Sequence, residues 1–334
     1  MANTAIQFLG GVGTVTGSKY VVTSGDQRIM VDCGLFQGVK DLRLQNRDPL
    51  SVDPASITAV LLTHAHLDHT GYLPLLVKNG FRGKVYCTPP TYDLAKIILI
   101  DSAHIQEEDA EEANRMGYSK HSPALPLYTV DDARRSLAMI KMIPGDGWQK
   151  LSEHAKFKFT PSGHILGSAF IELVVNGTKI VFSGDLGREH PIILPPRSTI
   201  ARADYILIES TYGDLLHTKS APAKELARIV NETIDRKGHL IIPSFAVGRV
   251  QEILFLLAGL KSKKSIPNIP IFLDSPMGIN ATEVFLKYPE WHNLKPKDVD
   301  ALAKVANMVH GQTQSFELSK RRESSIVIAG SGMV

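Results

Sequence analysis

The 334-residue sequence has only two cysteines, Cys33 and Cys87. Two thiols cannot build the disulfide framework of a small secreted protein, so we expect both to be reduced and buried. The first residues lack a basic segment followed by an apolar one, which predicts no secretory signal and a cytoplasmic protein. No apolar run approaches the roughly 18 residues that a membrane span needs, so we expect no membrane partner.

An excess of charge of one sign is also missing. The 37 basic and 34 acidic residues leave a formal net charge of +3, which permits a polyanionic partner but does not indicate one. The glycines near the N-terminus do not match a dinucleotide-binding fingerprint, because the third glycine comes one residue late. No Gly-Lys-Ser/Thr follows them either, so we predict a turn between two strands of the first sheet.

Apolar residues are abundant, at 43% of the chain, and the length exceeds what one core usually serves. In the first part, short aliphatic runs rich in Val and Ile predict buried strands, and each ends at a polar or glycine-containing turn. These runs are residues 29–31, 59–62, 180–182 and 205–208. Open α/β sheets place their sites at the carboxyl ends of strands, so we expect the polar residues there to converge.

After about Thr211 the pattern changes to alternating strands and helices. A helix is predicted from Pro222 to Lys237, because a proline lies at its start and Gly238 follows its end. Strands are predicted at 240–242, 271–273 and 326–328, and helices at 250–260 and 281–287. This alternation predicts a parallel sheet covered by helices. We therefore expect two α/β domains, residues 1–211 and 212–334, and a helical segment over 92–143 in the first.

The densest group of chemically active side chains is His64-Ala65-His66-Leu67-Asp68-His69, directly after a predicted buried strand. Three imidazoles and a carboxylate within six residues suit borderline metals such as zinc. In a tight strand-to-helix loop, His64 and His66 can face one ion while Asp68 and His69 face a second. A lone histidine is usually a core or surface residue, but this density indicates ligands.

Single residues downstream complete the set. His164 lies in SGHILGS and Asp185 in SGDLGR, both at strand ends. Either alone is as well explained as a turn residue, but beside the histidine cluster both become candidate ligands. A carboxylate such as Asp185 can bridge two cations that generate a hydroxide and hold the oxygens of a displacement. Asp32, after Val31, is a candidate for orienting the histidine loop.

The HxHxDH motif with a preceding Asp, a later His and a later Asp resembles the metallo-β-lactamase fold, an αββα sandwich. Further segments are similar, in order, to the β-CASP branch of RNA-processing nucleases, which includes the cleavage and polyadenylation endonuclease and its bacterial and archaeal relatives. They are GGVGTVTGS, VDCGLFQG, THAHLDHTGYLP, SGHILGSA, SGDLGR, ESTYGD, IPSFAVGR, LDSPMGINAT and AGSGM. The resemblance covers nearly the whole chain and implies an α/β β-CASP domain inserted into the sandwich.

The resemblance also implies two zinc ions. One would be held by His64, His66 and His164, the other served by Asp68 and His69, with Asp185 as the bridge. Glu209, in ESTYGD, matches the first acidic residue of the β-CASP motifs. The implied reaction is hydrolysis of a phosphodiester in single-stranded RNA by a metal-activated hydroxide, with Asp68 orienting or deprotonating the water. The candidate catalytic residues are therefore Asp68, Asp32 and Glu209.

Ser244 and Arg249 lie at a predicted strand-to-helix junction. Helix-start N–H groups and an arginine there can hold a phosphate, or the residues can simply cap the helix. Both interpretations remain open.

The sequence ends soon after its last apolar strand, whereas similar sequences continue. In the family, that continuation returns to the first domain and supplies two histidines, one beside the residue that matches Glu209 and one at the second metal. His292 and His310 do not lie in matching contexts. We therefore expect a fragment that lacks the C-terminal return segment, has an incomplete second metal site and has no general acid.

Three classes of function compete. The first is an RNA endonuclease, with a 5′→3′ exonuclease mode left open. The second is a metallo-β-lactamase-fold hydrolase of small molecules, against which the domain after Glu209 argues, because it would roof the site into a long cleft. The third is a non-catalytic RNA-binding scaffold, against which the intact set of candidate ligands argues. Homo-oligomers and further RNA-processing partners are left open.

Overall fold

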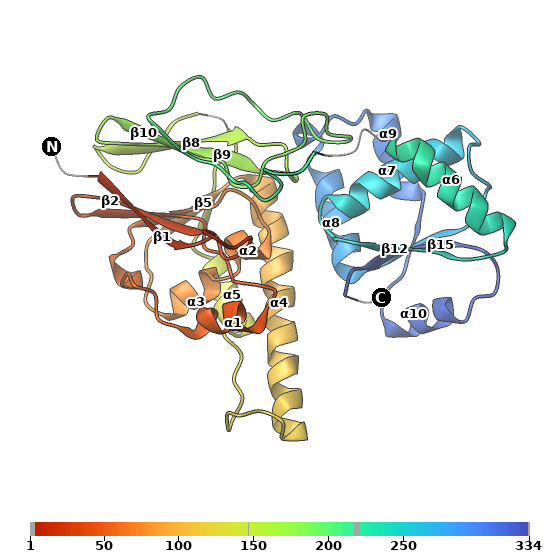
Figure 1. The fold of residues 1–334 in the computed structure, drawn as a ribbon, viewed down its shortest axis with the longest axis horizontal. Coiled ribbons are helices and arrows are strands. Elements are labelled where there is room, and N and C mark those ends of the chain that lie inside the picture. Colours follow the sequence, from red (N-terminus) through yellow and green to blue (C-terminus); the bar gives the residue numbers. More distant parts are fainter. Residues whose placement is uncertain (1–3, 146, 217–220, 333–334) are drawn as a thin grey trace. The chain divides into compact units, whose positions relative to one another are not determined.

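The computed structural model describes residues 4–145, 147–216 and 221–332, which form two compact units (Figure 1). Unit 1 comprises Met1–Glu189 and Pro196–Thr211, and unit 2 comprises His190–Pro195 and Tyr212–Val334. The short segment 190–195 belongs to unit 2 because the backbone N–H and the side-chain amide of Asn293 donate to the carbonyl oxygens of Ile193 and Leu194, at 2.9 and 3.2 Å.

Unit 1 contains two stacked β-sheets. The first has the order β1-β2-β3-β4-β5-β6, antiparallel from β1 to β3 and parallel from β3 to β6. Its strands are Thr4–Gly10, Lys19–Ser24, Gln27–Val31, Ala59–Leu61, Lys84–Cys87 and Ile140–Met142. The second has the order β11-β10-β9-β8-β7, antiparallel except for the parallel pair of β10 and β11. Its strands β7 to β11 are Gln149–Lys150, Ala155–Pro161, Ala169–Val175, Thr178–Phe182 and Tyr205–Leu207.

Alternation along the strands divides the apolar side chains between two cores. Val21 faces the helices, while its neighbour Val22 faces the second sheet. Between the sheets, Val31 packs in one cluster with Phe157 and Phe182. Because successive side chains point to opposite faces, one face of the first sheet is free for helices and the other for the second sheet.

Helices cover the outer face of the first sheet (Figure 1). Those of unit 1 are α1 Lys40–Leu44, α2 Leu67–Thr70, α3 Leu73–Lys78, α4 Pro89–Met116 and α5 Val130–Leu137. The prediction of a helical segment over 92–143 is wrong in part. Helix α4 ends where Gly117 adopts a left-handed conformation at φ 68°, and Ile140–Met142 forms strand β6. Thr129 and Asp132 form the capping box that starts α5.

Unit 2 is an α/β layer with a wholly parallel sheet of order β12-β15-β13-β14, which confirms the expected architecture. Its strands are Leu240–Ser244, Ile271–Asp274, Asn307–Met308 and Ile326–Gly330, numbered β12 to β15. Its helices are α6 Pro222–Asp235, α7 Arg249–Ser262, α8 Pro276–Lys287, α9 Pro296–Lys304 and α10 Gln312–Ser319. The sequence patterns did not reveal α9, α10 or the two-residue strand β14.

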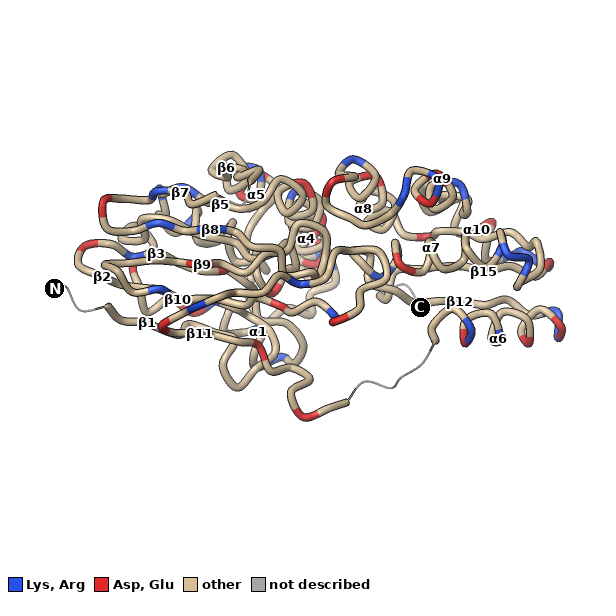
Figure 2. The backbone as a smooth tube through the Cα atoms, turned by 90° about the horizontal axis from the view of Figure 1, so that it is seen from above, with Lys and Arg blue, Asp and Glu red and all other residues tan. Residues whose placement is uncertain are grey.

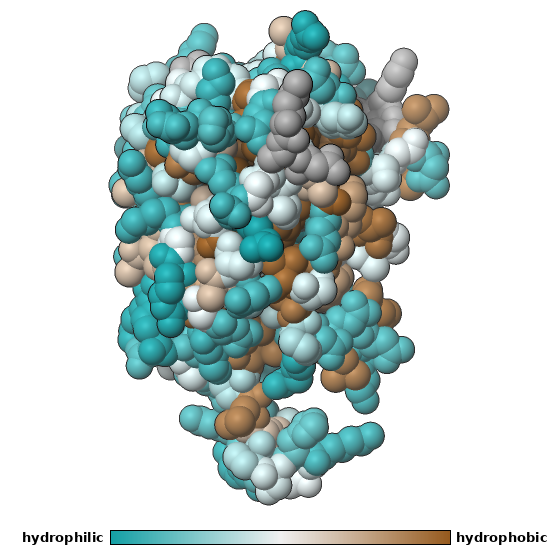
Figure 3. Space-filling view, turned by 90° about the vertical axis from the view of Figure 1, so that its left-hand side faces the viewer, coloured by the Kyte–Doolittle hydropathy of each residue, from teal (hydrophilic) through white to brown (hydrophobic). Residues whose placement is uncertain are grey.

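The prediction that the run 205–208 is buried is wrong. Tyr205 and Ile206 are 62% and 58% exposed, because β11 is the edge strand of its sheet. Apolar side chains also reach the surface among hydrophilic ones on the face drawn in Figure 3. In the part of the chain that the structure describes, no helix combines the length and apolar character needed to cross a membrane.

Candidate metal centre

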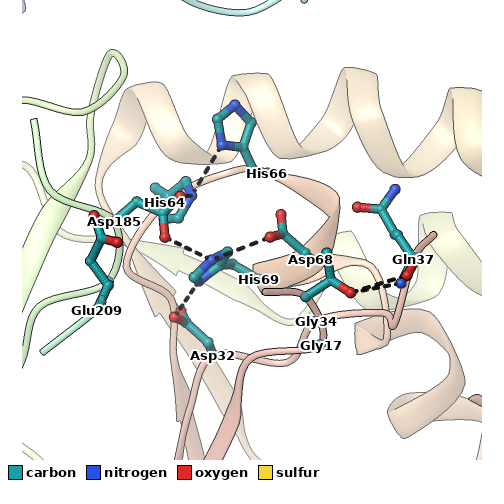
Figure 4. Close-up of polar contacts among 12 residues, drawn as sticks. Gly17, Asp32, Gly34, Gln37, His64, His66, Asp68, His69, Asp185 and Glu209 are labelled. Atoms are coloured by element: carbon teal, nitrogen blue, oxygen red, sulfur yellow. Dashed lines mark hydrogen bonds and ion pairs between the residues drawn. The ribbon is translucent and has the colours of Figure 1, made fainter. Parts of the chain in front are cut away.

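The polar residues at the strand ends of unit 1 converge, as the sequence predicts (Figure 4). Asp32 directly follows β3, and two residues separate His64 from the end of β4. His164 lies in the loop between β8 and β9, Asp185 follows β10 and Glu209 follows β11. Asp68 and His69 lie within the one-turn helix α2.

Three imidazoles and one carboxylate form the first group. Nδ1 of His66 lies 3.2 Å from Nε2 of His64 and 3.2 Å from Nε2 of His164. Oδ2 of Asp185 lies 3.3 Å from Nε2 of His164 and 3.7 Å from Nε2 of His64. All four donor atoms lie within 4.8 Å of one another.

The other oxygen of Asp185 faces a second group. Oδ1 lies 3.2 Å from Nε2 of His69, and the same nitrogen lies 3.7 Å from Oδ2 of Asp68. Asp185 therefore stands between the two groups and offers one carboxylate oxygen to each. This is the arrangement that a bridging carboxylate requires.

The separations within the first group fit a single zinc ion. Ligand bonds of about 2.0–2.1 Å in a tetrahedral site place neighbouring donor atoms about 3.3 Å apart. The donor-to-donor distances that involve His66 and Asp185 range from 3.2 to 3.7 Å, which includes this value. Nitrogen and carboxylate oxygen donors are also the ligands that zinc takes in hydrolytic sites.

The three imidazoles of the first group are in the neutral form that can bind a cation. Burial, reinforced by the neighbouring imidazoles, holds the pKa of His64 well below its usual range and lowers the pKa of His66 to about 3. Burial also lowers the pKa of His164. These rings are neutral at neutral pH, so each presents a lone pair to the centre of the group.

The second group is more strongly charged. Although burial opposes it, the carboxylates of Asp32 and Asp185 raise the pKa of His69 well above its usual range. Burial likewise opposes ionisation of Asp185, but the hydrogen bond to His69 and the positive charge of His69 lower its pKa to about 2. Burial raises the pKa of Asp68, which brings this carboxylate closer to the range of a general base.

Asp32 and Thr63 set which nitrogen of the His69 and His64 rings faces the centre. Oδ2 of Asp32 accepts from Nδ1 of His69 at 2.7 Å, which leaves Nε2 of His69 toward Asp185. Thr63 donates its hydroxyl to Asp32 at 2.9 Å and lies 3.0 Å from Nδ1 of His64. The hydroxyl can donate only once, so it accepts from His64 and leaves the lone pair of Nε2 free. The sequence patterns did not reveal this role of Thr63, although its place directly before His64 is a signal for it.

The loop that carries His164 is held from both sides. The hydroxyl oxygen of Ser168 accepts from the backbone N–H of His164 at 3.0 Å. Thr88 and Thr91, at the start of α4, donate to the carbonyl oxygen of Gly167 at 2.7 and 3.0 Å. No spacing in the sequence connects α4 with this loop, so the sequence could not have revealed the two threonines.

Glu209 lies beside Asp185 (Figure 4). Its carboxylate accepts from the backbone N–H of Leu186, next to Asp185, and of Thr211, both at 3.1 Å. Ser244 and Arg249 lie in unit 2. Ser244 is buried, and Arg249 forms an ion pair with Glu252 at 2.6 Å.

Two family models and several known proteins match this chain. The model of the metallo-β-lactamase superfamily matches residues 12–244, and the model of the Beta-Casp domain matches residues 250–334. The chain is 34% identical to Ribonuclease TTHA0252 of Thermus thermophilus, covering 97% of this chain and 72% of that protein. It is 32% identical to an RNase J-like protein of Methanocaldococcus jannaschii, covering 98% and 72% respectively.

One solved structure supports the fold alone. A protein of unknown function from Enterococcus faecalis V583 superposes with a TM-score of 0.52 at 15% identity, covering 98% of this chain and 77% of that one. The superfamily model spans more than half of the chain, and both relatives are more than 30% identical over almost all of it. The chain therefore belongs to the metallo-β-lactamase superfamily, carries a Beta-Casp domain, and is a metal-dependent hydrolase.

Proposed function

We propose that the chain is a zinc-dependent ribonuclease that cleaves single-stranded RNA internally. The observation that carries the proposal is the position of Asp185, whose Oδ2 lies 3.3 Å from His164 and whose Oδ1 lies 3.2 Å from His69. A two-ion site of this kind serves displacement at phosphorus, because both the attacking and the leaving oxygen need stabilisation. The name ribonuclease on the relative from Thermus thermophilus supports the choice of RNA.

In this proposal, His64, His66 and His164 would hold the first zinc ion, Asp68 and His69 would hold the second, and Asp185 would offer one carboxylate oxygen to each. When bound, the two ions would supply Lewis-acid chemistry, which makes a water more acidic and neutralises charge on the phosphate. His64, His66 and His164 suit this role because their rings are neutral.

The chain's own residues supply the proton chemistry and the orientation. Asp68 accepts the proton of the attacking water, a role that its raised pKa favours. Asp32 holds Nδ1–H of His69 and so fixes the ring's direction. Glu209 keeps the loop of Asp185 in place through the N–H of Leu186.

We assign the chemistry to residues 1–211 and a share of strand recognition to residues 212–334. Acidic and basic residues are interspersed along the chain (Figure 2), so recognition must depend on local groups. Ser244 and Arg249 are our candidates for a phosphate contact, in which a phosphate would replace Glu252 as the partner of Arg249. A cytoplasmic location, possible homo-oligomers and further RNA-processing partners belong to the same proposal.

The test is cleavage of a 5′-labelled single-stranded RNA by the zinc-loaded protein. Asp68→Ala removes both the proton acceptor and a proposed ligand of the second ion, so we expect a loss of at least about 10² in rate. Asp26→Ala, which changes an exposed carboxylate in the turn between β2 and β3, is the matched control and should cleave like the wild type. Labelled fragments of several lengths indicate internal cleavage, whereas release of labelled mononucleotides alone indicates 5′→3′ exonuclease action.

Two results would contradict the proposal. RNA that stays intact while a thioester or lactam is hydrolysed would favour a small-molecule hydrolase. Metal-independent RNA binding without turnover would favour a non-catalytic scaffold.

A further inference from the structure

Lys19 is a buried charged residue that the proposed mechanism does not use. It opens strand β2, and only 2% of its surface is exposed. Its ammonium group donates to the carbonyl oxygens of Gly34 at 2.7 Å and Gly17 at 3.1 Å. The same Nζ lies 4.2 Å from the ring centre of Phe36 and 5.2 Å from that of Tyr72. Burying an ammonium group is costly, so such a complete set of partners indicates a specific role.

The two loops that Lys19 joins, residues 16–18 and 33–36, hold the helix that carries Asp68 and His69. Helix α2 has only four residues, so its last carbonyl groups lie beyond the reach of helical partners. Backbone N–H groups of the two loops donate to this helix: Ser18 donates to Asp68 at 2.9 Å and Cys33 to His69 at 2.7 Å. Leu35 donates to Leu67 at 3.1 Å, in addition to the helical bond from Gly71 at 2.8 Å. Gly34 also donates to Ser18 at 2.9 Å, so the loops bond to each other.

These loops fit against α2 without spare room. A Cβ atom on Gly34 would lie 1.5 Å from the carbonyl oxygen of Asp68. A Cβ atom on Gly17 would lie 2.4 Å from the ring of Phe36. Gly34 therefore lies directly beside Asp68, as its label in Figure 4 indicates. A change in the separation of the loops would therefore be transmitted directly to the backbone of α2.

Two ligands of the first group, His64 and His164, are held by other contacts. Thr63 lies 3.0 Å from Nδ1 of His64, and Ser168 accepts from the N–H of His164 at 3.0 Å. His66 is the N-cap residue of α2. The contacts of Lys19 thus lead through α2 to both Asp68 and His69 of the second group, but to only one of the three imidazoles of the first.

We propose that Lys19 is a positioning residue for the second metal: by joining the two loops, it fixes Asp68 and His69 at the distance from Asp185 that this ion needs. The inference rests on the proposed two-zinc site. It predicts a selective effect, in which loss of Lys19 weakens binding of the second ion far more than binding of the ion held by His64, His66 and His164.

The test is a titration of the metal-free protein with Co²⁺, followed by visible absorption and calorimetry. We compare the wild type with Lys19→Met, which keeps the length of the side chain but removes its donors and charge. Groups that orient metal ligands typically account for about 10- to 100-fold in affinity. We therefore expect Lys19→Met to bind the second ion about 10- to 100-fold more weakly, while its affinity for the first ion should change by less than about threefold. Lys141→Met, an exposed lysine in β6 of the same sheet, is the matched control and should bind both ions like the wild type.

Lys19→Gln keeps one neutral donor group and is the variant to use if Lys19→Met does not fold. It should also weaken the affinity for the second ion. If the affinities for both ions fell equally, or if neither changed, the inference would be overturned. A merely structural role of Lys19 gives no reason for the two affinities to change by different amounts. A wild type that binds a single ion would overturn it together with the two-zinc proposal. A wild type that binds two ions but leaves RNA intact would contradict only the ribonuclease proposal.

Discussion

At the residue scale, the site depends on which nitrogen of each imidazole carries the proton. The carboxylate of Asp32 accepts from both Thr63 and His69, and Thr63 in turn contacts His64. The buried carboxylate of Asp32 therefore sets the tautomer of one ring in each group, His69 directly and His64 through Thr63. Asp32 adopts a left-handed conformation at φ 55°, which costs free energy for a residue other than glycine. The surrounding hydrogen bonds offset that strain.

Lys19 gives a pH prediction at the same scale. Burial lowers its pKa to about 8 from the ordinary value of 10.5. Below pH 8 the lysine is charged in both states, and its burial destabilises the fold. Between pH 8 and 10.5 the unfolded chain binds a proton that the folded chain does not, so stability rises with pH. The whole effect is about 3 kcal/mol.

Urea unfolding of the wild type and Lys19→Met between pH 7 and 10 checks this prediction. Other groups titrate in both proteins, so they cancel in the difference between the two free energies of unfolding. We expect that difference to move by about 2 to 3 kcal/mol in favour of the wild type as the pH rises. A difference that stays constant across this range would contradict the lowered pKa.

At the element scale, the strands and the ligand cluster that depend on a local pattern of residues could be predicted from the sequence. The strands before Asp32, His64 and Asp185 were predictable, because short apolar runs ending at polar turns are typical of buried strands. The density of ligand-type residues from His64 to His69 then indicated the metal site. What could not be predicted depends on contacts between distant segments: the exposure of the edge strand β11, the end of α4 at Gly117, and the partners of Lys19.

The contact between α4 and the His164 loop gives the second prediction. Gly167 has φ +80°, and an added Cβ would lie 2.8 Å from atoms of Thr88, Pro90 and Thr91. Gly177 has nearly the same φ, +82°, with nothing within 4 Å. We expect Gly177→Ala to cost about 1–2 kcal/mol, the strain of a left-handed alanine. Gly167→Ala should cost clearly more, because the loop must also move.

The free energy of unfolding in urea and the zinc content of both variants check this prediction. Movement of the loop displaces His164, so Gly167→Ala should also bind zinc more weakly, while Gly177→Ala should bind it like the wild type. Equal costs for the two alanines would show that α4 does not constrain the loop.

At the scale of the whole molecule, every candidate metal ligand lies in unit 1, between His64 and Asp185. Zinc that binds only the folded form stabilises it by RT ln(1 + [Zn]/Kd), about 2.7 kcal/mol at a hundredfold excess over Kd. This stabilisation should act on the unit that contains the site. Unit 2, with its own parallel sheet and helices, supplies none of these ligands.

Hydrogen exchange followed by mass spectrometry, with and without zinc, measures where that stabilisation acts. We expect zinc to slow exchange in peptides that span α2, the His164 loop and the end of β10, and a chelator to reverse the effect. Peptides from β12 to β15 should exchange at the same rate in both conditions, because no ligand anchors them. Asp185→Asn is the control, since it weakens the bridge between the two groups and should reduce the protection in unit 1. Protection that appears equally in unit 2 would contradict a metal centre confined to unit 1.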